Sequence, residues 1–405
     1  MKGIMNGIRV VEVAAWTYVP VAGAVLAEWG ADVIKIEHPE TGDPQRGLVT
    51  SGLMPGGPGG INFMMEFPNR GKRSVGLDLK SERGYELLLE LVKGADVFLT
   101  NFRPQARRNL RIDVDDLRAV NPKIIYVRGS GHGQRGPEAE RGGYDACSFW
   151  ARGGSADIIS TPGEYPSMQP GPAYGDVISG LTIAGGISAA LFHRERTGEA
   201  LVVDNSLLAT GMWATGAAVL MAGLFGFERF PQGNRARVPN PLVLSYRTKD
   251  DRFLSLIMLE SDRYWADLVT KVGRPELAGD DRFVDASARA QNSEACVAIL
   301  DEIFASRTFD EWKSALLEVD GVWAPVQTAS ELLTDPQVLA NGYLREVTVP
   351  SGATFRMVAS PLQFDEEPPD LLRAPEHGEH TDEVLQELGL DMDTILELKV
   401  AGAVL

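Results

Sequence analysis

The chain has 405 residues, of which 44% are hydrophobic and 23% are charged. These proportions are typical of globular proteins and exclude a chain that is disordered throughout. Because 39 Lys and Arg residues face 56 Asp and Glu residues, the formal net charge is −17. Such a chain would be repelled by nucleic acids and anionic membranes, so we expect neither as a partner. An anionic ligand then requires local clusters of basic residues.

The length predicts two or three domains with a sizeable core. Cys147 and Cys296 are the only cysteines of the sequence, so at most one disulfide is possible. The N-terminal segment MKGIMNGIRVVEV lacks the long apolar run and the cleavage site of a secretory signal. We therefore expect a cytoplasmic protein.

Strand and helix patterns alternate through the first half of the chain. Residues 8–13 (IRVVEV) and 31–37 (ADVIKIE) predict strands, and residues 20–29 (PVAGAVLAEW) predict the helix between them. Further strands are predicted at residues 73–78, 96–100 and 123–128, and further helices at residues 81–93 and 176–196. This order predicts the α/β class, with a Rossmann-like open parallel sheet.

The pattern changes after about residue 225. We assign residues 1–224 to a large α/β domain, which a loop-like stretch at residues 231–241 (PQGNRARVPNP) follows. Two strand patterns and several helix patterns predict a smaller α+β domain over residues 225–335. Residues 336–405 are expected to return to the large domain as a C-terminal tail.

One segment is long enough to cross a membrane. Residues 206–227 contain no charged side chain. Four glycines lower the mean apolarity of the segment, and no dense cluster of basic residues flanks it. We therefore favour a buried helix of the large domain over a membrane span.

Several familiar motifs give weak signals. Gly131, Gly133 and Gly136 in GHGQRG match a dinucleotide-binding fingerprint, but no apolar helix follows them, so a flexible loop is favoured. The five histidines are scattered, and we expect no metal site. The sequence has neither a GxSxG elbow nor a P-loop.

Asp176 stands directly after a loop and at the start of a predicted helix (YGDVISGL). The simplest interpretation is an N-cap, because Asp is among the preferred residues there. Gly175 and Gly180 leave the surface beside it bare, which allows a bulky ligand to approach. A helix start also favours the ionised carboxylate that a nucleophile needs.

Two groups of basic residues lie near predicted carboxyl ends of strands, where open α/β sheets bind ligands. They predict either a pocket for phosphate groups or solvated surface charge, and spacing does not decide between these. The first group is Arg70, Lys72, Arg73 and Lys80, and the second is Arg103, Arg107, Arg108 and Arg111.

Six stretches together resemble the family III coenzyme A transferases, the group that includes formyl-CoA transferase, carnitine CoA-transferase and the alpha-methylacyl-CoA racemases. They are GIRVVEV…LAEWGADVIKIEHPETGD, NRGKRSVGLDLK, ADVFLTNFRP, GHGQRGP, YGDVISG and GEHTDEVLQELGL, and they run from residue 7 to about residue 390. Each motif is modest, but six in family order cover nearly the whole chain.

The resemblance implies that Asp176 is the covalent nucleophile of a CoA transferase. Such an enzyme moves CoA from an acyl-CoA thioester to a small free carboxylic acid, through an aspartyl anhydride and an aspartyl-CoA thioester. The resemblance further implies a CoA-binding large domain, CoA thioester as substrate without a resident cofactor, and an interlocked homodimer.

The family's CoA contacts fall on nine positions of this sequence. His38 stands where the family has an Arg, and a second family Arg falls on Asn109, beside Arg108. The expected contacts are Thr17, Tyr18, His38, Leu77, Lys80, Asn101, Phe102, Arg108 and Tyr144.

An acyl-CoA racemase that exchanges an α-proton is the alternative on the same scaffold. The racemases carry a His-Asp pair where this chain has Tyr144-Asp145, and Glu260 falls where they place a further carboxylate. Since Tyr is a poor acid or base near neutral pH, the transferase is favoured. RVPNPLVL occupies the place of the glycine-rich flap of formyl-CoA transferase, so oxalate and formate are not expected as substrates.

Overall fold

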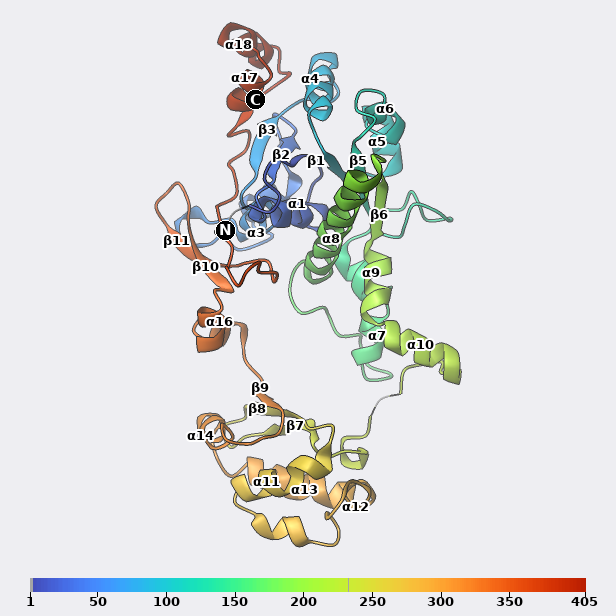
Figure 1. Ribbon diagram of the computed structural model, residues 1–405, viewed down its shortest axis with the longest axis vertical. Helices are drawn as coiled ribbons and strands as arrows, with labels where there is room; N and C mark the ends of the chain where they lie inside the picture. The colour runs from blue at the N-terminus through green and yellow to red at the C-terminus, as the bar shows by residue number, and fades with distance from the viewer. Residues whose placement is uncertain (1–2, 232) are drawn as a thin grey trace. The chain divides into compact units, whose positions relative to one another are not determined.

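The computed structural model describes residues 3–231 and 233–405 of the chain (Figure 1). Contacts between residues divide the chain into two compact units. The larger unit joins the chain up to Phe230 with Pro336–Leu405, and the smaller unit is Pro231–Asp335.

A six-stranded parallel sheet forms the centre of the larger unit, which confirms the α/β class predicted from sequence (Figure 1). The order is β3-β2-β1-β4-β5-β6, so it reverses between β1 and β4. Open α/β sheets bind ligands at such a reversal, outside the carboxyl ends of the strands. The strands are β1 (Arg9–Val13), β2 (Asp32–Glu37), β3 (Arg73–Gly76), β4 (Val97–Thr100), β5 (Ile125–Ser130) and β6 (Val202–Ser206).

Helices connect these strands and cover both faces of the sheet. The predicted helix at residues 176–196 is observed as α8, Tyr174–Thr197. The other helices before the smaller unit are α1 (Tyr18–Glu28), α2 (Gly47–Thr50), α3 (Phe63–Asn69), α4 (Glu82–Lys93), α5 (Pro104–Leu110), α6 (Val114–Arg118), α7 (Ser155–Ile159), α9 (Leu207–Ala214) and α10 (Gly216–Phe225), with a π-helix at Ala146–Ala151.

After the smaller unit the chain returns to the larger one. It adds α16 (Pro336–Ala340), the antiparallel pair β10 (Leu344–Thr348) and β11 (Thr354–Val358), α17 (Thr381–Glu387) and α18 (Met392–Val400). The last two helices bury Leu385 and Ile395 in the same hydrophobic cluster as α4 and one face of the sheet. Near its end the chain reaches β3, because Leu77 forms a β-bridge with Val404.

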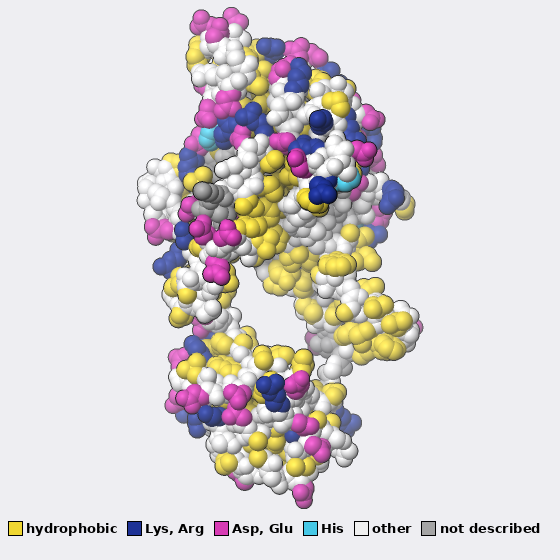
Figure 2. Space-filling view, viewed as in Figure 1, with side chains coloured by type: hydrophobic (Ala, Val, Ile, Leu, Met, Phe, Trp, Pro, Cys, Tyr) yellow, Lys and Arg dark blue, Asp and Glu magenta, His cyan; other side chains and the backbone are white. Residues whose placement is uncertain are grey.

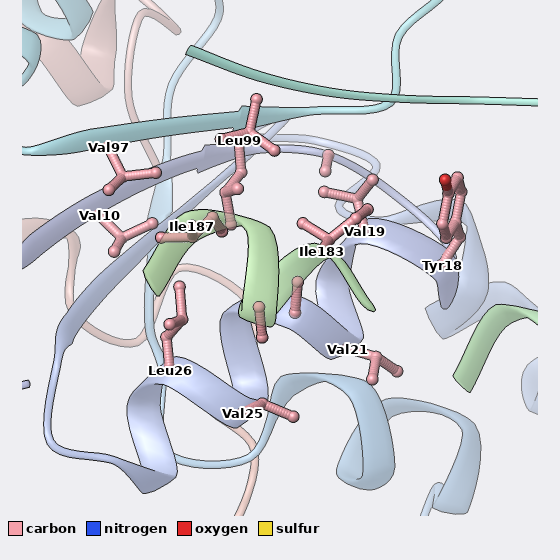
Figure 3. Packing of buried hydrophobic residues seen from close by; sticks show 14 of the residues in the cluster. Val10, Tyr18, Val19, Val21, Val25, Leu26, Val97, Leu99, Ile183 and Ile187 are labelled. Atoms are coloured by element: carbon pink, nitrogen blue, oxygen red, sulfur yellow. The ribbon is translucent and has the colours of Figure 1, made fainter. Parts of the chain in front are cut away.

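The opposite face of the sheet is covered by α1 and α8. In Figure 3, Ile183 and Ile187 of α8 lie between α1 and the strands that carry Val10, Val97 and Leu99. All five side chains are almost completely buried. Burying a side chain of this size contributes about 1.5–3 kcal/mol, so this layer is a main source of stability.

The smaller unit has its own core and a three-stranded antiparallel sheet in the order β7-β8-β9. Trp265, Phe304 and Trp312 are among its buried side chains. Its elements are β7 (Val243–Arg247), β8 (Phe253–Ile257), α11 (Ser261–Lys271), α12 (Ala286–Gln291), α13 (Ser293–Phe304), α14 (Phe309–Ala315), β9 (Trp323–Pro325) and α15 (Ala329–Leu332).

The single buried helix predicted for residues 206–227 is wrong. The segment forms α9 and α10, which meet at a bend of 70°. At the bend the Thr215 hydroxyl donates hydrogen bonds to the carbonyl oxygens of Gly153 and Gly211. No residue of α10, which the structure describes in full, is buried. Its apolar side chains, Leu220 and Phe225 among them, are exposed and form part of a hydrophobic surface in Figure 2.

By length and composition, α8 would suffice to cross a membrane, as would α9 and α10 taken together. In the structure α8 instead packs on α1 and the sheet, with Ile183 and Ile187 buried. This is the arrangement of a core helix in a globular unit.

A cluster of charged side chains is buried beside α1. The Glu12 carboxylate accepts hydrogen bonds from Lys72 Nζ at 2.8 Å and from Lys35 Nζ at 3.3 Å. Lys35 also pairs with Asp43 at 2.9 Å. Gly23 of α1 leaves room for this cluster, because a Cβ there would lie 2.1 Å from Glu12 Oε2.

The contact between α1 and α8 requires glycine at one position of α8. A Cβ at Gly180 would lie 2.7 Å from the Tyr18 carbonyl oxygen, whereas nothing lies within 4 Å of a Cβ at Gly185. We predict that Gly180→Ala lowers the free energy of unfolding by about 1–3 kcal/mol, because the helices must separate. Gly185→Ala, the matched control, should leave it unchanged or raise it by up to about 1 kcal/mol. Urea denaturation measures both, and equal effects would contradict the prediction.

Candidate active site

A cavity of about 950 Å³ opens at the carboxyl ends of the sheet strands. Its walls come from the segments that follow β1, β2, β4 and β5 and from the first turn of α8. They include Ala14, Trp16, Tyr18, His38, Asp43, Asn101, Phe102, Arg103, Arg107, Ser130, Gly131, Arg141, Tyr144, Cys147, Arg152, Asp176 and Leu207. The cavity therefore occupies the place where the strand order reverses.

Asp176 lies in the first turn of α8 and lines this cavity. The N-cap interpretation is wrong, because Ala173 occupies the N-cap position. Burial, and secondly the negative charge of Asp145, raise the pKa of Asp176 to about 8. The expectation that the helix start keeps this carboxylate ionised is therefore also wrong: loss of hydration and a like charge outweigh the helix dipole.

Asp145 is buried beside Asp176 and is itself fixed by two hydrogen bonds. One of its oxygens accepts the backbone N–H of Ala146 at 2.7 Å, and the other accepts Gln169 Nε2 at 2.8 Å. These bonds hold the like charge in place. Asp145 thus influences the protonation of Asp176 without belonging to the cavity wall.

Tyr18, at the start of α1, is buried and lines the cavity. Its hydroxyl donates a hydrogen bond to Oδ1 of Asn205, at the end of β6. Burial, and secondly the nearby Asp176, raise the pKa of Tyr18 well above its ordinary value. The side chain therefore stays a neutral hydrogen-bond donor over the whole range in which proteins are stable.

Two residues beside the cavity have a left-handed backbone that is rare for side-chain-bearing residues. Trp16 has φ 66° and Ala173 has φ 61°. The backbone N–H of Trp16 donates a hydrogen bond to Asp43 Oδ1 at 3.1 Å, which holds this residue in place. Its indole packs edge-on against Tyr144 with 5.8 Å between the ring centroids, so two aromatic rings form one wall of the cavity.

Five of the nine expected CoA contacts line the cavity together with Asp176, and these are Tyr18, His38, Asn101, Phe102 and Tyr144. Asn101 is fixed by two hydrogen bonds with the backbone of Ala15, at 3.1 and 2.6 Å. These six residues come from five separate segments of the chain, and the fold brings them to one cavity.

The remaining four expected contacts do not lie in the cavity wall. The Thr17 hydroxyl is buried and donates to Gln45 Oε1 at 2.8 Å. Leu77 is 1% exposed within the core. Lys80 is exposed. Arg108 is also exposed and pairs with Glu140 at 2.7 Å. Their contact with CoA stays a prediction.

The two basic groups behave differently. In the first, Arg70 pairs with Glu28, Lys72 is buried against Glu12, and Arg73 pairs with Asp32. These side chains stabilise the fold and do not line the cavity. In the second, Arg103 and Arg107 line the cavity. The guanidinium of Arg103 makes no ion pair within the described part of the chain.

Sequence reasoning did not assign a role to Trp16, Asn205 or Arg141. Asn205 lies at the carboxyl end of β6 and Trp16 follows β1 by three residues, so the rule that ligands bind at such ends was an available signal. Arg141 lies in an exposed glycine-rich loop, and no pattern marks it. Glu260 is the N-cap residue of α11 in the smaller unit, where it is exposed beside Arg263. Within the described ranges, no three His, Cys, Asp or Glu residues are grouped to hold a metal ion.

Comparison with known proteins identifies the relatives of this chain. The family model for CoA-transferase family III matches residues 5–381. The chain belongs to CoA-transferase family III. It is 32% identical over 398 residues to the cinnamoyl-CoA:phenyllactate CoA-transferase of Clostridium sporogenes, covering 98% of this chain and 96% of that protein. This confirms the resemblance on which the sequence was assigned to an enzyme of this family.

Two further relatives agree with this. The (R)-2-hydroxy-4-methylpentanoate CoA-transferase of Clostridioides difficile is 32% identical over 397 residues, with 98% of each chain covered. Among solved structures, a CAIB/BAIF family protein from Brucella suis is similar with a TM-score of 0.81 and 30% identity. That match covers 96% of this chain and all of the other. This family III chain is therefore a CoA transferase with the fold of its relatives.

The raised pKa of Asp176 makes the stability of this family III chain depend on pH. The pKa is 3.8 for the ordinary group and about 8 in the folded chain, so between these values the folded state keeps a proton that the unfolded state loses. Stability contributed by this proton is complete below pH 4 and is lost as the pH rises through 8.

We predict that Asp176→Asn becomes more stable relative to the natural chain as the pH rises from 5 to 8, because Asn carries no such proton. One pKa unit corresponds to about 1.4 kcal/mol. Between pH 5 and pH 8, the difference in free energy of unfolding between Asp176→Asn and the natural chain should therefore change by at least about 2 kcal/mol. Urea denaturation at both pH values measures it. If the two proteins differ in free energy of unfolding by the same amount at pH 5 and at pH 8, the pKa of Asp176 is not raised in the folded chain.

Proposed function

We propose that this enzyme moves CoA from an acyl-CoA thioester to a free carboxylic acid through covalent intermediates on Asp176. The observation that carries the proposal is the position of Asp176, which lines a cavity large enough for a thioester and has no cation paired with it among the described residues. A carboxylate that is not neutralised by a cation, and that is poorly hydrated, is a strong nucleophile.

In the first step, an oxygen of Asp176 attacks the thioester carbonyl carbon of the donor. The carbon–sulfur bond breaks, CoA leaves as the thiolate, and a mixed anhydride remains. The thiolate then attacks the aspartyl carbonyl carbon, which releases the donor acid as its carboxylate and leaves an aspartyl-CoA thioester. An acceptor carboxylate takes over the CoA by the reverse of these two steps, and Asp176 is regenerated as a carboxylate.

The cavity wall provides groups for both parts of the thioester. Arg103 lines the cavity without an ion pair among the described residues, so its guanidinium supplies positive charge for the phosphates of CoA. CoA enters as a substrate, and the proposed reaction uses no resident cofactor. Near Tyr144, the edge-on ring of Trp16 offers an apolar wall for an acyl group. Relatives named for cinnamoyl and 2-hydroxy-4-methylpentanoate groups make such acids suitable first substrates for a test.

Mass spectrometry of the intact protein tests the covalent step. After incubation with cinnamoyl-CoA, succinyl-CoA and 4-methylpentanoyl-CoA in turn, we expect a mass increase that hydroxylamine removes and that maps to Asp176. Asp176→Ala should abolish both the adduct and turnover, by at least about 1000-fold. Asp310→Ala, at an exposed carboxylate of the smaller unit, is the matched control and should behave as the natural enzyme.

The absence of any adduct would contradict the proposal. If deuterium then enters the α-carbon of a 2-methylacyl-CoA, the enzyme is a racemase by α-proton exchange.

The pH dependence of turnover follows from the same carboxylate. Because the attacking group must be ionised, we predict that kcat/KM rises about tenfold per pH unit below a midpoint near the Asp176 pKa of about 8. Asp145→Asn removes the like charge and should move this midpoint to lower pH. Steady-state kinetics from pH 5.5 to 9 measures both midpoints. An unchanged midpoint in Asp145→Asn would contradict the electrostatic cause.

We also propose that two copies of the chain form a homodimer in the cytoplasm. The family resemblance implies this assembly, and the exposed apolar side chains of α10 give it a surface to bury. We predict a mass of about twice the 43.9 kDa of one chain in sedimentation velocity. A species of one chain at micromolar concentration would contradict the dimer.

A further inference from the structure

Two glycines lie against Tyr18, one at its ring and one at its main chain. Tyr18 is 5% exposed and lines the same cavity as Asp176. A Cβ at Gly129 of β5 would lie 2.8 Å from Cε1 of the Tyr18 ring, and a Cβ at Gly180 of α8 would lie 2.7 Å from the Tyr18 carbonyl oxygen. The strand and the helix therefore approach Tyr18 as closely as the absence of side chains allows.

This packing holds Tyr18 beside Asp176. Asp176 and Gly180 are four residues apart on α8, so they lie one above the other on the same face of the helix. The main chain of Tyr18 packs against this face at Gly180. The electrostatic effect of Asp176 on the pKa of Tyr18 agrees with this arrangement.

The hydrogen-bond acceptor of the Tyr18 hydroxyl, Asn205, also has a second donor. The hydroxyl donates to Oδ1 of Asn205, and the same oxygen also accepts from Thr210 Oγ1 at 3.2 Å. When the hydroxyl turns to another acceptor, Asn205 keeps a donor, and no buried polar group is left unpaired.

We propose that the Tyr18 hydroxyl is a catalytic hydrogen-bond donor for acyl transfer at Asp176, and that Asn205 positions it. This proposal rests on the function proposed above. As Asp176 attacks the thioester carbonyl carbon, the carbonyl oxygen gains negative charge, and the hydroxyl turns from Asn205 to that oxygen. The proton stays on Tyr18. The charge leaves with the CoA thiolate when the carbon–sulfur bond breaks, and the hydroxyl returns to Asn205.

Tyr18→Phe tests the proposal, because it keeps the ring in its place and removes the hydroxyl. Loss of one such donor typically lowers kcat by 100- to 1000-fold, so we expect a fall of about 100-fold with KM for acyl-CoA within about threefold of normal. The rate of adduct formation at Asp176 in a single turnover should fall by the same factor. The matched control is Tyr126→Phe, which removes a buried hydroxyl bonded to the Ile112 carbonyl oxygen, away from the cavity. Its kcat should stay within about twofold.

Asn205→Ala provides a second variant that leaves Tyr18 intact. It removes the group that orients the hydroxyl, and we expect kcat to fall by about tenfold. In the double variant with Tyr18→Phe, the loss should equal that of Tyr18→Phe alone, because both changes act through one hydroxyl. Losses that multiply would show that Asn205 does not act through Tyr18.

The outcomes separate this proposal from the function on which it rests. If the natural enzyme forms the adduct and Tyr18→Phe forms it at the same rate, Tyr18 is not a donor, and the transferase stands. If Tyr18→Phe raises KM and leaves kcat unchanged, Tyr18 only contacts CoA, and the proposal fails. If the natural enzyme forms no adduct at Asp176, both proposals fail. If Tyr18→Phe does not fold, Asn205→Ala still tests the proposal. A normal kcat in that variant would show that Asn205 does not position a catalytic hydroxyl.

Discussion

The Glu12 carboxylate lies between the ammonium groups of Lys35 and Lys72, and none of the three side chains is exposed. Burying three charges is costly, and only good geometry and further hydrogen bonds offset that cost. Lys35 donates to the Ala14 carbonyl oxygen at 2.8 Å, and Lys72 donates to the Pro20 carbonyl oxygen at 2.7 Å. The cluster thus fixes the end of β1 and the first turn of α1, the two segments between which Trp16 and Tyr18 enter the cavity.

The same cluster extends to the cavity wall through Asp43. One oxygen of Asp43 pairs with Lys35, and the other accepts the N–H groups of Trp16 and Gln45. Gln45 in turn accepts the Thr17 hydroxyl. A left-handed backbone at Trp16 persists only where its surroundings hold it, and the Asp43 hydrogen bond is part of that restraint. The site is therefore positioned by buried charges that take no part in the chemistry.

More of the fold than of the candidate site could be predicted from the sequence. Alternating strands and helices identify the parallel sheet, and two residues that the family resemblance marks, Asn101 and Phe102, line the cavity. Lys72 could not be placed, because its charge favours the surface and only the distant Glu12 explains its burial. Leu77 enters the core beside Val404 through a pairing between distant parts of the chain, which no local pattern reveals. The bend between α9 and α10 likewise depends on Gly153, far from Thr215 in sequence.

Glu12 and Asp176 show that one fold uses poorly hydrated carboxylates in two opposite ways. Glu12 has the amino groups of Lys35 and Lys72 within hydrogen-bond distance, so its negative charge has partners and its oxygens are held in place. Asp176 faces Asp145 instead, and burial together with that like charge raises its pKa to about 8. The free energy that makes the ionised form of Asp176 unfavourable is the same free energy that makes it reactive once it is ionised. The same electrostatic environment therefore lowers stability at high pH and makes the ionised Asp176 a stronger nucleophile. A substitution that raises stability at high pH by removing this unfavourable environment must also weaken the nucleophile.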